Sequence, residues 1–194
     1  MFRKSAARTA RILNVTRSRV RPGVYLELAR DAAGKYPSDD KVLFHLVLAL
    51  TENKEWEEAA DVAGRAAELS VDPEILIVAA WSFITVGRGE DARAAVAKVL
   101  DGQPLEPYVR TEAVFLRGAA NSILGEMELA EPDLRAAVAR NDQSPTYIWH
   151  LAKFLVVNDR RDEALELVTI ARRVADEADR AEALGELAEM GLVP

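Results

Sequence analysis

Few side chains of this sequence are of the kinds that commonly catalyse reactions or bind metal ions. The chain has two histidines, His45 and His150, which lie 105 positions apart, and no cysteine. No glycine-rich phosphate loop, dinucleotide motif or closely spaced histidine pair is present. Acidic residues are spread over the whole chain, and no two stand out as an acid and base pair. We therefore expect no enzymatic activity, no cofactor and no metal site, and interpret both histidines as helix-surface or core residues.

Basic side chains are concentrated in residues 1–21, which contain no acidic residue and carry a formal charge of +7. The other 18 basic and 32 acidic residues give residues 22–194 a charge of −14. The candidate contacts to an anionic partner are Arg3, Lys4, Arg8, Arg11, Arg17, Arg19 and Arg21. Because the acidic body repels anions, contact of this segment with nucleic acid or a membrane is disfavoured, although not excluded.

The basic segment also has a weak helical pattern. Phe2, Ala6, Ala10 and Leu13 recur every three to four positions, which indicates an amphipathic helix over residues 2–15. Three roles remain open: a flexible or self-docking segment, a contact to anionic lipid or phosphate, and a targeting segment, since it is rich in arginine and free of acids.

Four alanines recur at a nearly constant spacing and indicate how the chain is organised. Ala59, Ala92, Ala130 and Ala164 are separated by 33, 38 and 34 residues, each early in a helical segment that follows another helical segment. Such a period indicates helical pairs stacked side by side. The composition agrees, because the 194 residues include only 10 glycines and 8 prolines. We therefore expect an all-α protein.

Apolar residues at offsets 0, 3, 4 and 7 give the first helix of each pair one buried stripe. The clearest stripes are Leu43, Leu46, Val47 and Leu50; Leu76, Ala79, Ala80 and Phe83; and Ile148, Leu151, Ala152 and Leu155. Short turns at 52–55, 87–89, 125–127 and 158–161 predict antiparallel neighbours. A capping side chain before a proline marks helix starts at residues 72–74 and 144–145.

This pattern resembles the tetratricopeptide repeat, which has a small residue in the first helix and two small residues seven apart in the second. The first position holds Val47, Ala80, Gly118 and Ala152; the second-helix pairs are Ala59 with Ala66, Ala92 with Val99, Ala130 with Ala137, and Ala164 with Ala171. The resemblance covers about residues 22–175, as four degenerate repeats after a half repeat around Ala29 and Ala32. It implies a right-handed α-solenoid of stacked antiparallel helical hairpins.

The third repeat departs from the pattern. Arg117 and Asn121 occupy positions that are apolar elsewhere, Pro132 lies early in the second helix, and residues 101–108 form a longer loop. We expect a local register shift, with a buried polar pair as the alternative. After Ala171 the helical pattern continues, and residues 176–194 are predicted to form a capping helix.

The resemblance places a concave binding groove on the first helices. Its predicted lining residues are Phe44, Leu48, Ile77, Trp81, Ile84, Phe115, Trp149, Lys153 and Val156. The basic and amide side chains with which some relatives grip a terminal carboxylate are absent, so an apolar helix or peptide is the expected ligand. Four large aromatics in an open groove would present roughly 600 to 1,000 Å². The alternative is a tighter curvature that folds these rings into the core.

We interpret the chain as a non-enzymatic protein-protein interaction scaffold, with an N-terminal basic tail or helix (1–21), a repeat domain (22–175) and a C-terminal cap (176–194). The alternatives are homo-oligomeric assembly through the groove or the tail, and an accessory or regulatory subunit whose tail contacts an anionic partner. The longest apolar stretch, residues 75–86, is too short to span a bilayer. With no apolar leader and no cysteine, a cytoplasmic location is expected.

Overall fold

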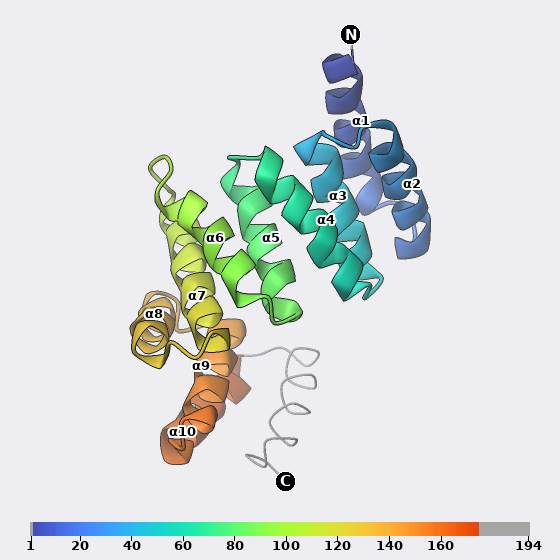
Figure 1. Cartoon of the computed structure of the whole chain (residues 1–194). Coiled ribbons are helices and arrows are strands. Elements are labelled where there is room, and N and C mark those ends of the chain that lie inside the picture. Colours follow the sequence, from blue (N-terminus) through green and yellow to red (C-terminus); the bar gives the residue numbers. More distant parts are fainter. Residues whose placement is uncertain (1, 175–194) are drawn as a thin grey trace. The chain divides into compact units, whose positions relative to one another are not determined.

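The computed structural model describes residues 2–174, and these residues fold into helices, turns and loops without a strand. The helices are α1 (Phe2–Arg17), α2 (Pro22–Lys35), α3 (Asp40–Glu52), α4 (Trp56–Leu69), α5 (Pro73–Thr85), α6 (Gly89–Leu100), α7 (Pro107–Ile123), α8 (Met127–Arg140), α9 (Pro145–Val157) and α10 (Arg161–Val174). Figure 1 shows them in chain order, as consecutive pairs. The all-α prediction is confirmed, whereas the predicted cap at 176–194 lies outside the described residues.

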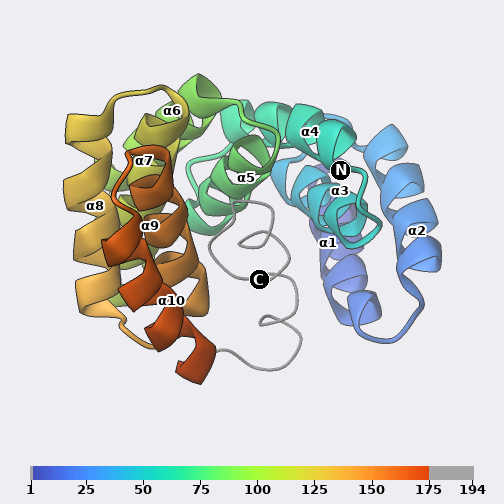
Figure 2. The ribbon, with the colours of Figure 1, turned by 90° about the horizontal axis from the view of Figure 1, so that it is seen from below.

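The chain divides into two compact units, residues 1–109 and 110–194, and the boundary falls in the first turn of α7. The first unit contains α1 to α6. Figure 2 shows its odd-numbered helices on the inner side and its even-numbered helices on the outer side. Each helix packs against the next one in the chain, and α3 also packs against α1 and α5. This is the two-layered stacking expected of helical pairs.

The basic N-terminal segment forms the first helix of this unit. α1 packs against α2 and α3 and buries Ala6, Ala10 and Leu13, three residues of the predicted apolar pattern. The start of α1 is joined to the end of α2 by a 2.7 Å hydrogen bond between Ser5 Oγ and Tyr36 Oη. The half repeat predicted before residue 40 is therefore a complete helical pair, α1 with α2.

The same turn joins the two helices in four successive pairs. One residue takes a left-handed conformation: Lys54 (φ 61°), Gly87 (φ 75°), Gly125 (φ 76°) and Asp159 (φ 58°). The next residue donates its N–H to the carbonyl five positions earlier: Glu55 to Leu50, Arg88 to Phe83, Glu126 to Asn121 and Arg160 to Leu155, at 2.8 to 3.0 Å. This Schellman arrangement ends one helix and turns the chain directly into the next.

The predicted helix starts and core alanines are confirmed. Asp72 accepts a hydrogen bond from the Glu74 N–H at 3.1 Å, Ser144 caps α9 through the Tyr147 N–H, and each cap precedes a proline at the start of its helix. Ala59, Ala92, Ala130 and Ala164 are at most 1% exposed. These small side chains let the helices of each unit approach closely.

In the second unit, close approach depends most on a glycine. A Cβ atom added to Gly118 of α7 would lie 2.9 Å from Asp133 Cβ and 3.0 Å from the Leu134 nitrogen, both in α8.

The structure also shows where the two polar residues of the third repeat lie. Arg117 is exposed and forms an ion pair of 2.6 Å with Asp133, whereas Asn121 is buried. Arg117 and Asn121 therefore do not form a buried polar pair.

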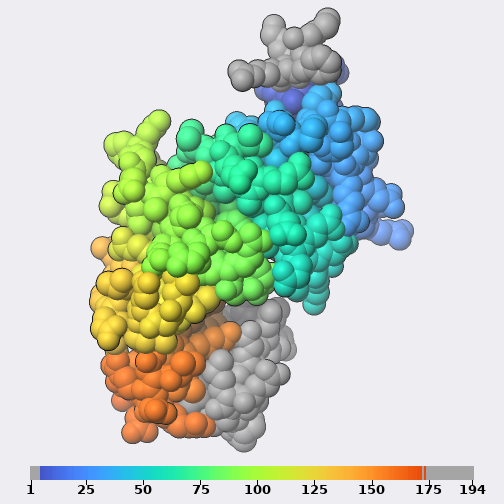
Figure 3. Space-filling view, viewed as in Figure 1, coloured from blue at the N-terminus to red at the C-terminus, as the bar shows by residue number. Residues whose placement is uncertain are grey.

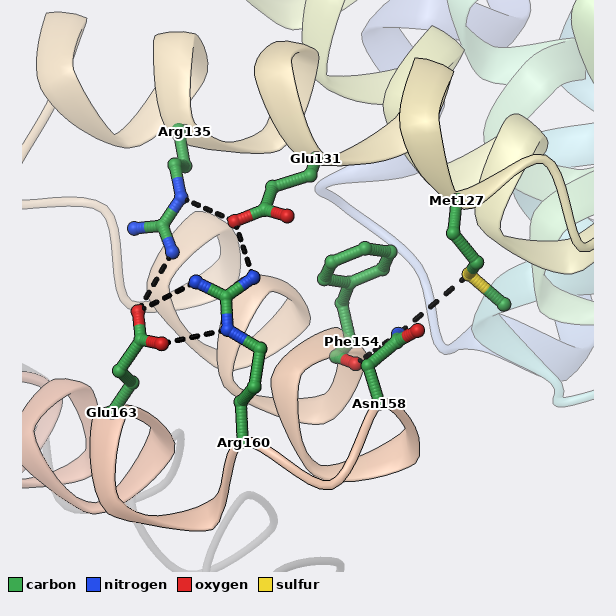
Figure 4. A network of polar contacts seen from close by, with 7 residues as sticks. All are labelled: Met127, Glu131, Arg135, Phe154, Asn158, Arg160 and Glu163. Atoms are coloured by element: carbon green, nitrogen blue, oxygen red, sulfur yellow. Dashed lines mark hydrogen bonds and ion pairs between the residues drawn. The ribbon is translucent and has the colours of Figure 1, made fainter.

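Ion pairs connect second helices to one another. Arg88 joins Asp61 of α4 to Asp91 of α6, and Arg160, at the equivalent position, joins Glu131 of α8 to Glu163 of α10. Figure 4 shows the latter network, in which Arg135 also contacts both carboxylates. The hydrogen bond from Arg160, and then that from Arg135, lowers the pKa of Glu131. Because these side chains remain accessible to solvent, their ion pairs orient the helices more than they stabilise them.

Candidate binding surface

The first helices of the first unit carry a row of partly exposed apolar side chains. Phe44 and Leu48 of α3 and Ile77, Trp81 and Ile84 of α5 are all half-buried. Phe44 and Leu48 are four positions apart, as are Ile77 and Trp81, so each pair lies on one helix face. The structure thus leaves five of the predicted groove residues accessible within one unit.

Two members of this row line an apolar hollow. Leu48 and Trp81 border a space of about 180 Å³, which extends between α3, α4 and α5. The other lining residues are Thr51, Trp56, Ala59, Val78, Ser82 and Thr85. An apolar cavity of about 150 Å³ accommodates a benzene molecule. The hollow therefore has room for one large apolar side chain.

A larger and more polar hollow lies between α1, α3 and α5. It has a volume of about 360 Å³ and includes Phe44, His45 and Ile75 in its lining. Charged residues of both signs border it: Arg11, Lys41, Asp72 and Glu74. The two hollows share α3 and α5, so a ligand lying along these helices would meet a charged end and an apolar end.

His45 forms part of the floor of the larger hollow and is 5% exposed. Its Nδ1 lies 2.9 Å from Tyr25 Oη of α2, and its imidazole is also hydrogen-bonded to the backbone of Ala10 in α1. Burial lowers the pKa of His45 to about 4, and the nearby Arg17 adds to this effect. His45 is therefore a neutral core residue that connects the first three helices.

In the second unit, the two predicted aromatic groove residues are buried. Phe115 is 0% exposed because its ring stacks on Tyr147, with centroids 4.6 Å apart, and meets the edge of His150. Trp149 is 7% exposed, and its Nε1 has no hydrogen-bond partner among the described residues. These rings belong to the core, as the alternative of folded-in aromatics anticipated, and they do not line an open groove. Lys153 and Val156 of α9 remain half-buried.

The basic residues of α1 and the following turn do not act as one group. Arg17 forms a 2.5 Å ion pair with Glu52 of α3 and is therefore occupied within the fold. Arg8, Arg11, Arg19 and Arg21 are exposed. The side chains of Arg3 and Lys4 are not among those that the structure describes. The sequence predicted seven equivalent cations, whereas the fold uses one of them to hold α1 against α3.

Sequence reasoning missed the second-helix contribution to the apolar hollow. Trp56 begins α4 and is 40% exposed, and it borders the hollow beside Leu48. Val78 follows the predicted Ile77 directly. The signal that could have identified Trp56 was a large aromatic residue at the start of a second helix. The other second helices start at Pro22, Gly89, Met127 and Arg161.

Within residues 2–174, no three or more His, Asp or Glu side chains are grouped so as to hold a metal ion. Among the same residues, no helix combines the length and the apolar character needed to cross a bilayer.

Solved structures with the same fold include tetratricopeptide-repeat proteins. The protein TTC0263 of Thermus thermophilus matches with a TM-score of 0.69 at 19% identity, over 97% of this chain and 100% of that one. PilW, a type IV pilus biogenesis factor, matches with a TM-score of 0.70 at 18% identity, over 93% of this chain and 86% of that one. YrrB, described as having an unusual peptide-binding site, matches with a TM-score of 0.63 at 14% identity, over 91% of this chain and 90% of that one. No family model and no curated protein sequence matches.

The chain thus has the tetratricopeptide-repeat fold, as its sequence pattern indicated. Proteins with this fold are generally scaffolds for protein-protein interaction. At these identities the likeness establishes the fold alone.

Proposed function

We propose that this protein is a non-enzymatic scaffold that binds an apolar helix or peptide of a protein partner on the first helices of its first unit. The observation that carries the proposal is the apolar hollow bordered by Leu48 and Trp81. A large apolar side chain of the partner occupies this hollow, and Phe44, Ile77 and Ile84 extend the contact along α3 and α5. The accessible Lys153 and Val156 of the second unit form a separate, smaller contact.

Burial of flat aromatic surface provides most of the affinity in this proposal. Trp81 is half-buried in the free protein, so contacts with its neighbours restrict its motion before a partner arrives. A preorganised side chain loses little conformational entropy on binding. Trp is also among the residues that most often dominate binding energies at interfaces. Trp81 is therefore the expected anchor, and Trp149, which is buried, is not.

The known fold supports a peptide ligand but does not identify it. YrrB, which has this fold, is described as having a peptide-binding site. The charged hollow next to the apolar one gives a peptide polar groups to meet at Arg11, Lys41, Asp72 and Glu74. Such a ligand combines one large apolar residue with charged neighbours, which is the usual composition of an amphipathic helix.

The test is an affinity capture from native lysate, with bound proteins identified by mass spectrometry. The intact chain is compared with Trp81→Glu, which places a charge in the apolar hollow. Val71→Glu is the matched control, because it introduces the same charge at a loop residue that is 90% exposed and borders neither hollow. Circular dichroism establishes that both variants are folded.

A protein captured by the intact chain and the control, but not by Trp81→Glu, supports the proposal. Its affinity is then measured by calorimetry, and Trp81→Ala is expected to weaken binding by about 2 kcal/mol or more, the threshold of a hot spot. Equal recovery with all three proteins would refute the role of this surface.

A further inference from the structure

The outer end of the first unit carries an apolar patch that is separate from the groove. Ile12 and Val15 of α1 are 55% and 47% exposed, and Val24 and Leu28 of α2 are 46% and 44% exposed. We call these four residues the end patch. They belong to the blue end of the first unit in Figure 3. Exposed aliphatic side chains on two helices that pack against each other are of the kind that marks an interaction site.

Helical spacing places the two residues of each helix on one side of that helix. Ile12 and Val15 lie opposite the buried Ala6, Ala10 and Leu13 on α1, and Val24 and Leu28 are one turn apart on α2. α1 and α2 are antiparallel, since Ser5 near the start of α1 bonds to Tyr36 just after the end of α2. Val15 therefore lies level with Val24, and Ile12 with Leu28.

The next pair shows why these residues are exposed. Positions 34 residues later are Leu46, Ala49 and Val62 for Ile12, Val15 and Leu28, and they are 5%, 0% and 6% exposed. The position for Val24 is Glu58, which is exposed and pairs with Arg30 of α2. Three of the four positions are therefore covered in α3 and α4, where another helical pair precedes them. In α1 and α2 the corresponding residues are exposed, whereas an exposed outer face of a repeat array is normally polar. The end patch thus has the apolar character of a face on which another helical pair packs.

The charges around the end patch are arranged by helix. Arg8 and Arg11 of α1 are exposed, and Glu27 and Asp31 of α2 are exposed. Asp31 forms an ion pair of 2.5 Å with Lys35. The α1 side of the face is therefore basic, and the α2 side keeps the acidic Glu27, because Lys35 offsets Asp31. The apolar residues lie between the two sides.

We propose that the end patch binds the end patch of a second copy of this chain. A two-fold axis parallel to the helices places α1 of one copy over α2 of the other. This axis brings each basic side opposite an acidic side, twice in the dimer, whereas an axis across the helices would oppose like charges. Such a self-complementary arrangement is an isologous interface.

The expected dimer is weak, because the face is small. With a width of about 10 Å and a rise of about 1.5 Å per residue, the 16 residues of α1 and the 14 residues of α2 give a face of roughly 450 Å² per copy. Stable complexes bury about 800 Å² per partner. The dimer is therefore expected to form at high protein concentration and to dissociate on dilution.

Sedimentation equilibrium over a hundredfold range of concentration tests the proposal. The intact chain is expected to shift from monomer to dimer, and Leu28→Asp is expected to remain monomeric. Val71→Asp, with the same new charge on a loop away from the end patch, serves as the control and is expected to dimerise. A monomeric intact chain at every concentration, or a dimer that Leu28→Asp leaves unchanged, would overturn the proposal.

Two charge reversals test the orientation. In the proposed dimer Arg8→Glu places an acidic side chain opposite Glu27, and Glu27→Arg places a basic side chain opposite Arg8, so each variant alone is expected to dimerise at least about tenfold more weakly. Mixing the two variants restores opposite charges on both sides of the two-fold axis, so a mixed dimer of native affinity is expected. Failure of the mixture to dimerise would contradict this arrangement.

The groove and the end patch are independent. Trp81→Glu alters the groove and is expected to dimerise like the intact chain. Loss of dimerisation in Trp81→Glu with a normal circular dichroism spectrum would place the second copy in the groove, and so would overturn the end-patch interface. Failure of the partner capture described above would leave the dimer unaffected.

Discussion

At the scale of single residues, the environment of each side chain decides its role more than its type does. Phe44 and Phe115 are equivalent in the repeat, but Phe115 is covered by Tyr147, whereas the position equivalent to Tyr147 beside Phe44 holds the smaller Ile75. Phe44 therefore borders a hollow of about 360 Å³, and Phe115 is fully buried. A single side chain in the first helix of the next pair therefore decides whether the phenylalanine lies at the surface or in the core.

His45 makes the stability of the first unit depend on pH. Its pKa is lowered from 6.5 to about 4 in the folded protein, first by burial and then by Arg17. Between pH 6.5 and 4 the unfolded chain takes up a proton that the folded chain does not, so stability falls as the pH falls, by at most about 3 kcal/mol. Urea unfolding at several pH values measures this loss.

His45→Gln is the control for the pH series, because glutamine keeps hydrogen-bonding groups near Tyr25 but does not titrate. Its unfolding free energy is expected to vary less between pH 6.5 and 4. An equal slope for both proteins would show that other groups cause the dependence.

Asn121 is a buried polar residue at an otherwise apolar position. Its Oδ1 has no hydrogen-bond partner within the part of the chain that the structure describes, whereas the equivalent Leu50, Phe83 and Leu155 are apolar and buried. Asn121→Leu is expected to raise the unfolding free energy by about 1 kcal/mol, because it removes an unpaired buried group. Thermal unfolding measures the change. A lower melting temperature would indicate that the site cannot accommodate the branched side chain.

At the scale of helices and turns, the repeated left-handed residue is the feature that sets the angle between paired helices. Gly87 adopts φ 75° with open space around its Cα. Gly87→Ala is therefore expected to lower stability by about 1 kcal/mol through backbone strain alone. Gly64→Ala makes the same change inside α4, where the added Cβ meets the Phe83 ring at an ordinary 3.8 Å.

Gly64→Ala is expected to raise stability by up to about 1 kcal/mol, since alanine favours a helix interior. Opposite signs for the two variants in guanidinium unfolding would confirm that conformation decides the effect. A stabilising Gly87→Ala would contradict the assigned turn.

The helical pairs were predictable because their signals are local. The capped prolines, the spaced alanines and the apolar stripes each depend on residues within one or two turns of a helix. Burial of Phe115 was not predictable from these signals, because it depends on Tyr147, 32 residues later in the chain. The basic charge of α1 also concealed its apolar stripe, in which two of the four residues are alanines.

At the scale of the molecule, the N-terminal segment is part of the folded first unit. Leu13 is 4% exposed, so Leu13→Ala is expected to lower the unfolding free energy by about 2 to 4 kcal/mol. Ile12→Ala, at a neighbouring residue that is 55% exposed, is expected to change it by less than about 0.5 kcal/mol at dilute, monomeric concentration. Tryptophan fluorescence in urea compares them. Equal, small effects would mean that residues 1–17 are a loose tail.

Leu48 and Trp81 lie on the neighbouring helices α3 and α5, so the distance between these helices sets the length of ligand that is needed to cross them. Packed helices lie about 8 to 10 Å apart. An extended peptide covers that distance in about three residues, whereas a helix needs about six or seven, close to two turns. A helical ligand that crosses from α3 to α5 therefore needs about seven residues for the crossing, so that its residues over the two helices, i and i+7, share one face. An extended ligand crosses in about three residues, and its side chains at i and i+3 then point to opposite faces.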